Sequence, residues 1–351
     1  MQQDMNFLDR NEFNFEPSEE VIKAFNSFDI KKLCFYTRIY GEGKKSIFSV
    51  YLSERYGIDE QQIILGYGAE DLLKQAVHFF LTEGENKTML IPKFSWWYYK
   101  SIADEVGGTT QQYPVYEGGD TFCYDFEGLK SMIDVVNPKI LLVASPNNPT
   151  GNGLTPSELE QLLQMVRPST IVLVDEAYAS FVSADTLYVK YLVETYSNIV
   201  VCRTLSKFYG LPGLRMGFGF VGRGEEMDRF THYSNKYLGY DRLSEEIAIA
   251  ALKSEDHYRR VADVMQEARE MYTREIAPLE GFKVYRSVAN FILIKYPIEL
   301  KQSLQQAFAD QSYKIKFMDE PGINTHMRIT LGRREQNRTV CDTILHIAKQ
   351  R

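Results

Sequence analysis

Short apolar runs, each closed by a polar or turn residue, alternate with segments of helical pattern along the first two thirds of the chain. The runs cover residues 63–65, 88–91, 140–144, 171–174, 199–202 and 216–221. The intervening segments carry apolar residues at helical spacing, as residues 157–166 do. Short continuous apolar runs are typical of strands that are buried on both faces, as in parallel sheets. We therefore expect an α/β domain with a mixed, mostly parallel central sheet.

The pattern changes after about residue 245. One long helical stretch covers residues 244–275, and three strand candidates follow at 282–285, 291–294 and 327–330. Helical patterns at 297–311 and 335–349 complete a profile that is typical of a small α+β domain. With 351 residues, the chain is long enough for two domains. We expect a large domain over residues 36–250 and a small domain formed by residues 1–35 and 251–351.

Composition excludes several classes of function. The net charge of −7 gives no basic surface for nucleic acid or for an anionic membrane. Four scattered cysteines (Cys34, Cys123, Cys202 and Cys341) show neither disulfide nor metal spacing, which favours a reducing cytoplasm and no metal site. Residues 1–10 lack the apolar stretch of a signal peptide, and no apolar run reaches the roughly 18 residues that cross a membrane.

Residues with useful chemistry follow the apolar runs. Residues 145–151 (SPNNPTG) form a rigid turn, and Asp175 follows a predicted buried strand, where a carboxylate needs a cationic partner. Lys207 stands among small hydroxyl residues and, when desolvated, would be nucleophilic toward an aldehyde. Arg215 lies in the glycine-rich stretch 210–217 and could hold a phosphate through two parallel hydrogen bonds. Ligands of parallel sheets bind at the carboxyl ends of the strands, which is where these groups are expected.

Each of these features, taken singly, has a plain structural alternative. The turn could be an ordinary β-turn, the acid a helix N-cap or part of a salt bridge, and the lysine and arginine surface residues. Their order and spacing, however, resemble the fold-type I pyridoxal-phosphate (PLP) aminotransferases, in the histidinol-phosphate aminotransferase-like branch. The matching strings are SPNNPTG at 145–151, VDEAY at 174–178, TLSK at 204–207, GLRMG at 213–217 and MRITLG at 327–332.

The resemblance implies a role for each residue around the cofactor ring. Lys207 would form the Schiff base with the cofactor and later act as general acid and base. Asp175 would pair with the protonated pyridine nitrogen, which keeps the ring an electron sink. Tyr178 and Asn148 would hydrogen-bond the phenolic oxygen of the ring, and Phe94 would stack on its face.

The resemblance also implies residues for the phosphate and for the substrate. Arg328 would bind the substrate carboxylate as a bidentate fork, and Asn11 would lie on the substrate side. Tyr40 would reach the phosphate of the partner subunit, so the protein would be a homodimer with shared active sites. The phosphate of the same subunit would be held by Gly68, Ala69, Glu70, Thr204, Ser206 and Arg215, with the helix that starts after residue 68 presenting free N–H groups.

The substrate half departs from the family pattern. Residues 11–15 read NEFNF, where the family usually has Asn-Glu-Asn-Pro-Tyr, and Met318 and Asp319 stand where an arginine often precedes an aspartate. Lys316 is nearby and could replace the charge of that arginine but not its fork geometry. Residues 96–99 (WWYY) are unusually aromatic.

The expected activity is transfer of an amino group between an amino acid, glutamate in the first place, and a keto acid or an aldehyde or ketone phosphate. A PLP lyase or decarboxylase of the threonine-phosphate decarboxylase type would use the same cofactor residues. Arg328 favours transamination, because it would hold the substrate carboxylate in the plane of the cofactor ring, where the bond to that carboxylate is not the one that breaks. A non-catalytic PLP-binding protein is disfavoured by the complete set of Lys207, Asp175, Tyr178 and Arg215.

Overall fold

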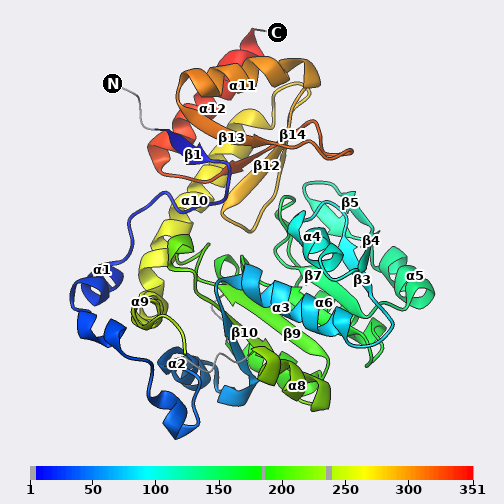
Figure 1. The fold of residues 1–351 in the computed structure, drawn as a ribbon. Helices are drawn as coiled ribbons and strands as arrows, with labels where there is room; N and C mark the ends of the chain where they lie inside the picture. Colours follow the sequence, from blue (N-terminus) through cyan, green and yellow to red (C-terminus); the bar gives the residue numbers. More distant parts are fainter. Residues whose placement is uncertain (1–4, 184–185, 235–238, 351) are drawn as a thin grey trace.

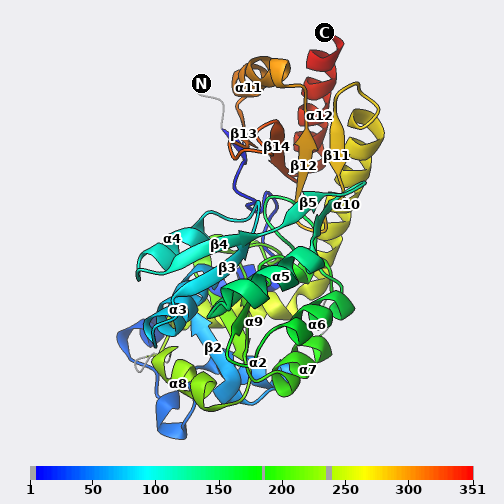
Figure 2. The ribbon, with the colours of Figure 1, turned by 90° about the vertical axis from the view of Figure 1, so that its right-hand side faces the viewer.

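Two large sheets and a two-stranded ribbon make up the β-structure of the described residues, and the five-stranded sheet and its helices are stacked on the seven-stranded sheet and its helices (Figure 1, Figure 2). The computed structural model describes residues 5–183, 186–234 and 239–350. Both described ends of the chain lie beside the small sheet (Figure 1). In the part of the chain that the structure describes, no helix combines the length and the apolar character needed to cross a membrane.

The large sheet confirms the expected mixed, mostly parallel architecture. Only β10 among its described strands runs antiparallel to its neighbours, β2 and β9. The central strands β7, β8 and β9 are buried along their whole length, as their continuous apolar runs predict. The strand order is β2 (Ile63–Gly66), β10 (Gly217–Val221), β9 (Ile199–Thr204), β8 (Ile171–Asp175), β7 (Ile140–Ala144), β3 (Thr88–Pro92) and β4 (Thr109–Tyr113).

Helices cover both faces of this sheet, and each face has its own apolar core. One face packs against α3 (Ala69–Thr82), α4 (Tyr98–Asp104) and α8 (Glu225–Ser234). The other packs against α2 (Ile47–Tyr56), α5 (Phe126–Val136), α6 (Pro156–Met165), α7 (Leu187–Thr195) and α9 (Arg242–Lys253). A two-stranded ribbon, β5 (Val115–Glu117) with β6 (Phe122–Tyr124), extends from the edge near β4.

The small sheet contains five described strands, of which the sequence pattern predicted three. Its order is β1 (Asn6–Leu8), β13 (Tyr313–Phe317), β14 (His326–Thr330), β12 (Phe291–Lys295) and β11 (Lys283–Tyr285). Its apolar face packs on α10 (Glu255–Ile276), α11 (Lys301–Asp310) and α12 (Arg334–Lys349). β1 therefore brings the N-terminal segment into this sheet, whereas α1 (Glu19–Asn26) packs against α9.

The single helix expected over residues 244–275 is instead two helices, α9 and α10, which meet at Ser254. The Ser254 hydroxyl donates to the Ala250 carbonyl at 2.7 Å and accepts from Ser18 at 2.8 Å. A serine hydroxyl that competes for backbone acceptors interrupts a helix, so periodicity alone missed this break. The 3-10 turns are η1 (Ile30–Cys34), η2 (Ile39–Glu42), η3 (Glu60–Gln62), η4 (Ala179–Phe181), η5 (Pro212–Leu214) and η6 (Ile298–Leu300).

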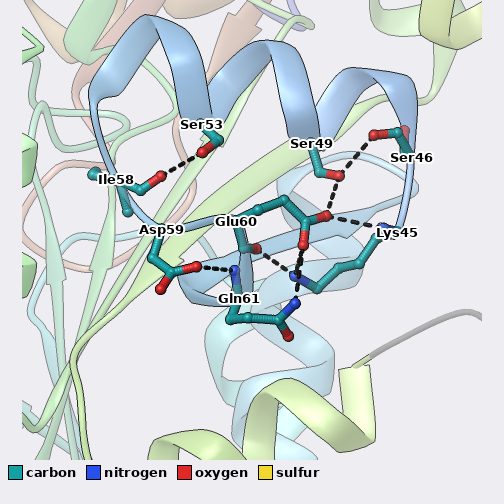
Figure 3. Close-up of polar contacts among 8 residues, drawn as sticks. All are labelled: Lys45, Ser46, Ser49, Ser53, Ile58, Asp59, Glu60 and Gln61. Carbon is teal, nitrogen blue, oxygen red and sulfur yellow. Dashed lines mark hydrogen bonds and ion pairs between the residues drawn. The ribbon is translucent and has the colours of Figure 1, made fainter. Parts of the chain in front are cut away.

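A buried ion pair fixes the approach to the first strand of the large sheet (Figure 3). Lys45 Nζ lies 3.1 Å from Glu60 Oε2, and both side chains are almost fully buried. Glu60 Oε1 also accepts from the Lys45 amide at 3.0 Å and from Ser49 Oγ at 2.5 Å. These contacts join the start of α2 to η3, so that β2 and the loop after it begin from a fixed point.

Loss of one partner of this pair should destabilise the protein strongly. We expect Lys45→Met to lower the free energy of unfolding by about 3–5 kcal/mol, because Glu60 is left as an unpaired buried charge. Denaturant unfolding measures the effect, with Glu54→Gln on the exposed side of α2 as the control. The double variant Lys45→Met/Glu60→Gln should lose less than the sum of the two single variants, and simple additivity would contradict a coupled pair.

Candidate active site

A cavity of about 1060 Å³ opens at the carboxyl ends of the large-sheet strands, between that sheet and β13 and β14 of the small sheet. This is the edge at which ligands of parallel sheets bind. Register pairing brings the ends of β7, β8 and β9 side by side, with Asp175 between Ala144 and Cys202. The cavity wall includes twelve of the fourteen predicted site residues: Asn11, Gly68, Ala69, Glu70, Asn148, Asp175, Tyr178, Thr204, Ser206, Lys207, Arg215 and Arg328.

Lys207 lies just beyond β9 and points toward the N-terminal segment. Its Nζ donates to the carbonyl oxygens of Arg10 at 3.1 Å and Asn11 at 3.3 Å, and lies 5.9 Å from the ring centre of Tyr178. Burial and the nearby Arg328 cation lower the pKa of Lys207 to about 8. A larger fraction of the amine is therefore neutral near neutral pH, which makes it a better nucleophile toward an aldehyde.

Asp175 ends β8 and is 6% exposed. Its Oδ2 accepts from the Tyr99 hydroxyl at 2.6 Å and its Oδ1 from the Ala177 amide at 2.9 Å. Burial raises the pKa of this carboxyl, while the two hydrogen bonds and the nearby Lys207 oppose the rise. A buried acid at a cavity wall is suited to pair with a cationic ring nitrogen.

Polar groups opposite Asp175 link the two sheets. Tyr178 accepts from Asn11 Nδ2 at 2.8 Å, and burial raises the pKa of its phenol to about 12, so it stays protonated. Arg328, on β14, donates to Asn148 Oδ1 and to the Asp9 carbonyl. Its Nε is buried without a hydrogen-bond partner among the described residues, which leaves a donor available within the wall of the site.

The start of α3 forms an anion cradle with the loop after β9. Gly68 has φ +87° and precedes the free N–H groups of the first turn of α3. A Cβ at Gly217 would lie 2.3 Å from the Gly68 backbone, so only glycine allows β10 to approach this turn. Thr204 Oγ1 and Ser206 Oγ lie 2.9 Å apart at the same cavity wall. Arg215 completes the cradle, with its Nη2 donating to the Tyr67 carbonyl at 2.9 Å and lying 3.6 Å from Glu70 Oε2.

Two predicted site residues do not line this cavity. The Phe94 ring packs edge-on against Phe122 at 5.9 Å and against Gly322, and its role in stacking on the cofactor ring stays a prediction. Phe94 has φ +54°, and the nearby Trp96 and Trp97 line the cavity. Tyr40, on η2, is not among the residues that line the cavity of its own chain.

Sequence reasoning missed two groups at the site. Tyr99 is buried in a run of four aromatic residues, and nothing in that run distinguishes a core tyrosine from one bonded to Asp175. Arg10 contributes its backbone carbonyl, and because every residue has one, the residue type gives no indication of this role. No group of three or more His, Cys, Asp or Glu side chains suited to a metal lies within residues 5–183, 186–234 and 239–350.

The chemistry of the donor set fits pyridoxal 5'-phosphate. An anion cradle, a buried carboxylate and an amine of lowered pKa match a phosphate, a ring nitrogen and an aldehyde respectively. When bound, such a ring takes up the electron pair released at the substrate α carbon. The fold and the site therefore define a PLP-dependent enzyme.

Comparisons with known proteins identify the family. The model of the family described as aminotransferase class I and II matches residues 3–344, so the chain belongs to that family and its cofactor is pyridoxal 5'-phosphate. The histidinol-phosphate aminotransferase of Ruminiclostridium cellulolyticum is 30% identical over 297 residues, which are 84% of this chain and 80% of that protein.

Solved structures show the same fold. The histidinol-phosphate aminotransferase from Sinorhizobium meliloti in complex with pyridoxal-5'-phosphate superposes with a TM-score of 0.84 at 20% identity, covering 99% of this chain and 91% of that one. The L-threonine-O-3-phosphate decarboxylase from Porphyromonas gingivalis gives 0.80 at 19% identity, covering 98% and 100%. One scaffold thus accommodates both reaction types, and the fold does not decide between them.

Borohydride reduction should fix the cofactor to Lys207. We expect the reduced wild-type protein to retain the cofactor after denaturation, and Lys207→Ala to lose it, because Lys207 combines a place in the cavity wall with a lowered pKa. Peptide mass spectrometry measures the attachment. Lys314→Ala, which removes a different lysine from the cavity wall, is the control. Cofactor retained covalently by Lys207→Ala would overturn the assignment.

Proposed function

We propose that the protein transfers an amino group from an amino acid, with glutamate as the donor, to a keto acid or to an aldehyde or ketone that carries a phosphate. The Arg328 guanidinium is the observation that carries the proposal. It is buried in the cavity wall, and no carboxylate of the described residues lies within ion-pair distance of it. A buried cation without an anionic partner is costly, so this position is suited to a substrate carboxylate.

The other residues take roles that follow from their positions. Lys207 would hold the cofactor and would accept and return the proton of the substrate α carbon. Asp175 would hold the ring nitrogen in its protonated form, and Tyr178 and Asn148 would bind the ring oxygen. The cradle of Gly68, Thr204, Ser206 and Arg215 anchors the phosphate.

A second acidic group on the substrate is favoured by the register of the small sheet. Lys316 on β13 is the direct cross-strand partner of Arg328 on β14, so both side chains lie on the face toward the cavity. Like charges placed opposite each other in a sheet repel, and an anion between them relieves the repulsion. The distal carboxylate of glutamate or the phosphate of an acceptor would both meet this requirement.

Reaction with L-glutamate in the absence of an acceptor tests the proposal. We expect 2-oxoglutarate in an amount stoichiometric with the enzyme, and no carbon dioxide. Arg328→Lys should raise the glutamate concentration that gives the half-maximal rate of this half-reaction by about tenfold, because a single ammonium replaces the fork, while cofactor content is unchanged. A coupled dehydrogenase assay of the released keto acid measures both the yield of 2-oxoglutarate and its dependence on the glutamate concentration. Carbon dioxide release without keto acid would favour a decarboxylase like the Porphyromonas gingivalis enzyme instead.

We also propose that the enzyme is a cytoplasmic homodimer that acts in amino-acid biosynthesis. All four cysteines are unpaired, which suits a reducing compartment. In this proposal the exposed apolar side chains of the N-terminal segment form the dimer surface, because a partner subunit would cover them. They are Ile22, Phe25, Ile30, Leu33, Phe35 and Tyr36. Tyr40 follows this segment, and its position outside its own cavity supports a role at the partner's phosphate.

Disruption of this surface should separate the subunits. We expect Phe35→Asp to shift the protein toward monomer and to weaken cofactor retention, because Tyr40 would no longer reach the second site. Sedimentation velocity measures the mass, and the visible absorbance of the protein peak reports the cofactor. Val135→Asp, at an exposed valine of α5 on the opposite side of the large domain, is the control (Figure 1). A cofactor-loaded, active wild-type monomer would refute the proposal.

A further inference from the structure

Tyr99 is buried in the cavity wall and bonded to the carboxylate that faces the cofactor ring. It lies in α4, is 3% exposed, and donates from its hydroxyl to Asp175 Oδ2 at 2.6 Å. The other oxygen of Asp175 accepts from the Ala177 amide. We propose that Tyr99 is a positioning residue for the cofactor, whose hydroxyl orients Asp175 and keeps it ionised opposite the protonated ring nitrogen.

The need for such a donor follows from the surroundings of Asp175. Burial is the largest influence on this carboxyl and raises its pKa, and the charge of Glu176 acts in the same direction. A carboxyl group that took up a proton could not hold the ring nitrogen in its cationic form. The hydrogen bond from Tyr99 stabilises the ionised form of Asp175 and so opposes the rise in pKa that burial causes.

The direction of this hydrogen bond is fixed by the ionisation of both partners. Burial and the charge of Asp175 raise the pKa of the Tyr99 phenol well above its usual value, so the hydroxyl keeps its proton and acts as the donor. A carboxylate has about four lone-pair sites on its two oxygens, so bonds from Tyr99 and Ala177 still leave sites for the ring nitrogen. The other titratable side chains near the carboxylate are Glu176, Lys207, Cys202, Tyr124 and Tyr178.

The packing of α4 holds the hydroxyl in place. The Tyr99 ring meets Trp96 edge-on at 5.7 Å and belongs to the apolar core that α4 shares with Leu142 and Ala144 of β7. β7 is the direct neighbour of β8, and the register places Ala144 beside Asp175. The donor and the acceptor are thus anchored on rigid elements of one core, as a preorganised site requires.

The test compares Tyr99→Phe with Tyr113→Phe in the holoenzyme. Tyr113 is equally buried, and its hydroxyl donates to the Leu142 carbonyl at 3.0 Å, so its loss controls for a missing buried hydrogen bond away from Asp175. With cofactor labelled at the ring nitrogen, the ¹⁵N chemical shift reports ring protonation directly. The wild type and Tyr113→Phe should show a protonated ring throughout a pH titration, and Tyr99→Phe a ring that loses its proton as the pH rises.

A second readout is the affinity of the apoprotein for the cofactor. We expect Tyr99→Phe to raise the Kd roughly ten- to hundredfold, the range for loss of a hydrogen bond to a charged group, and Tyr113→Phe to leave it unchanged. Wild-type ¹⁵N shifts and wild-type affinity in Tyr99→Phe would overturn the proposal and leave Tyr99 a core residue. Neither measurement involves a substrate, so failure here is distinct from failure of the proposed aminotransferase activity.

Discussion

The active site depends on the docking of one residue, Asn11, where the N-terminal segment crosses from the small sheet to the large one. Its amide donates to Thr330 on β14, and its side chain donates to Tyr178 of the large domain. Its carbonyl accepts from Lys207 at 3.3 Å and from Asn290 at 3.0 Å. Asn11 has φ +56°, a left-handed conformation that asparagine tolerates better than most residues. One residue thus sets the distance between the lysine and the wall that carries Arg328.

Strand ends could be predicted from sequence because apolar runs and turn residues mark them locally. Asp175, Lys207 and Arg215 lie at the expected edge of the sheet for that reason. Groups whose roles depend on tertiary packing could not be predicted in the same way. In the sequence, Tyr99 is one aromatic residue among four. It bonds Asp175 because α4 packs against β7, and β7 is paired with β8, which carries Asp175.

The errors in the secondary-structure prediction have similar causes. Strand β13 alternates half-buried and exposed residues from Tyr313 to Lys316 and ends on the buried Phe317, so it lacks the continuous apolar run that marks the other strands. The break at Ser254 requires its hydroxyl to bond Ala250 and Ser18, and the second of these is distant in sequence.

Electrostatic coupling between Arg328 and Lys207 gives the site a property that neither residue has alone. The Arg328 cation contributes to the lowered pKa of Lys207 in the free protein. A substrate carboxylate bound at Arg328, as proposed, would neutralise much of that charge within the same low-dielectric cavity. The amine would then become more basic when substrate is present. A free site needs a neutral amine that can react with an aldehyde, whereas a loaded site needs a base that can accept a proton from the α carbon. Because Arg328 lies near Lys207, substrate binding would itself change Lys207 from a nucleophile toward the aldehyde into a base for the α-carbon proton.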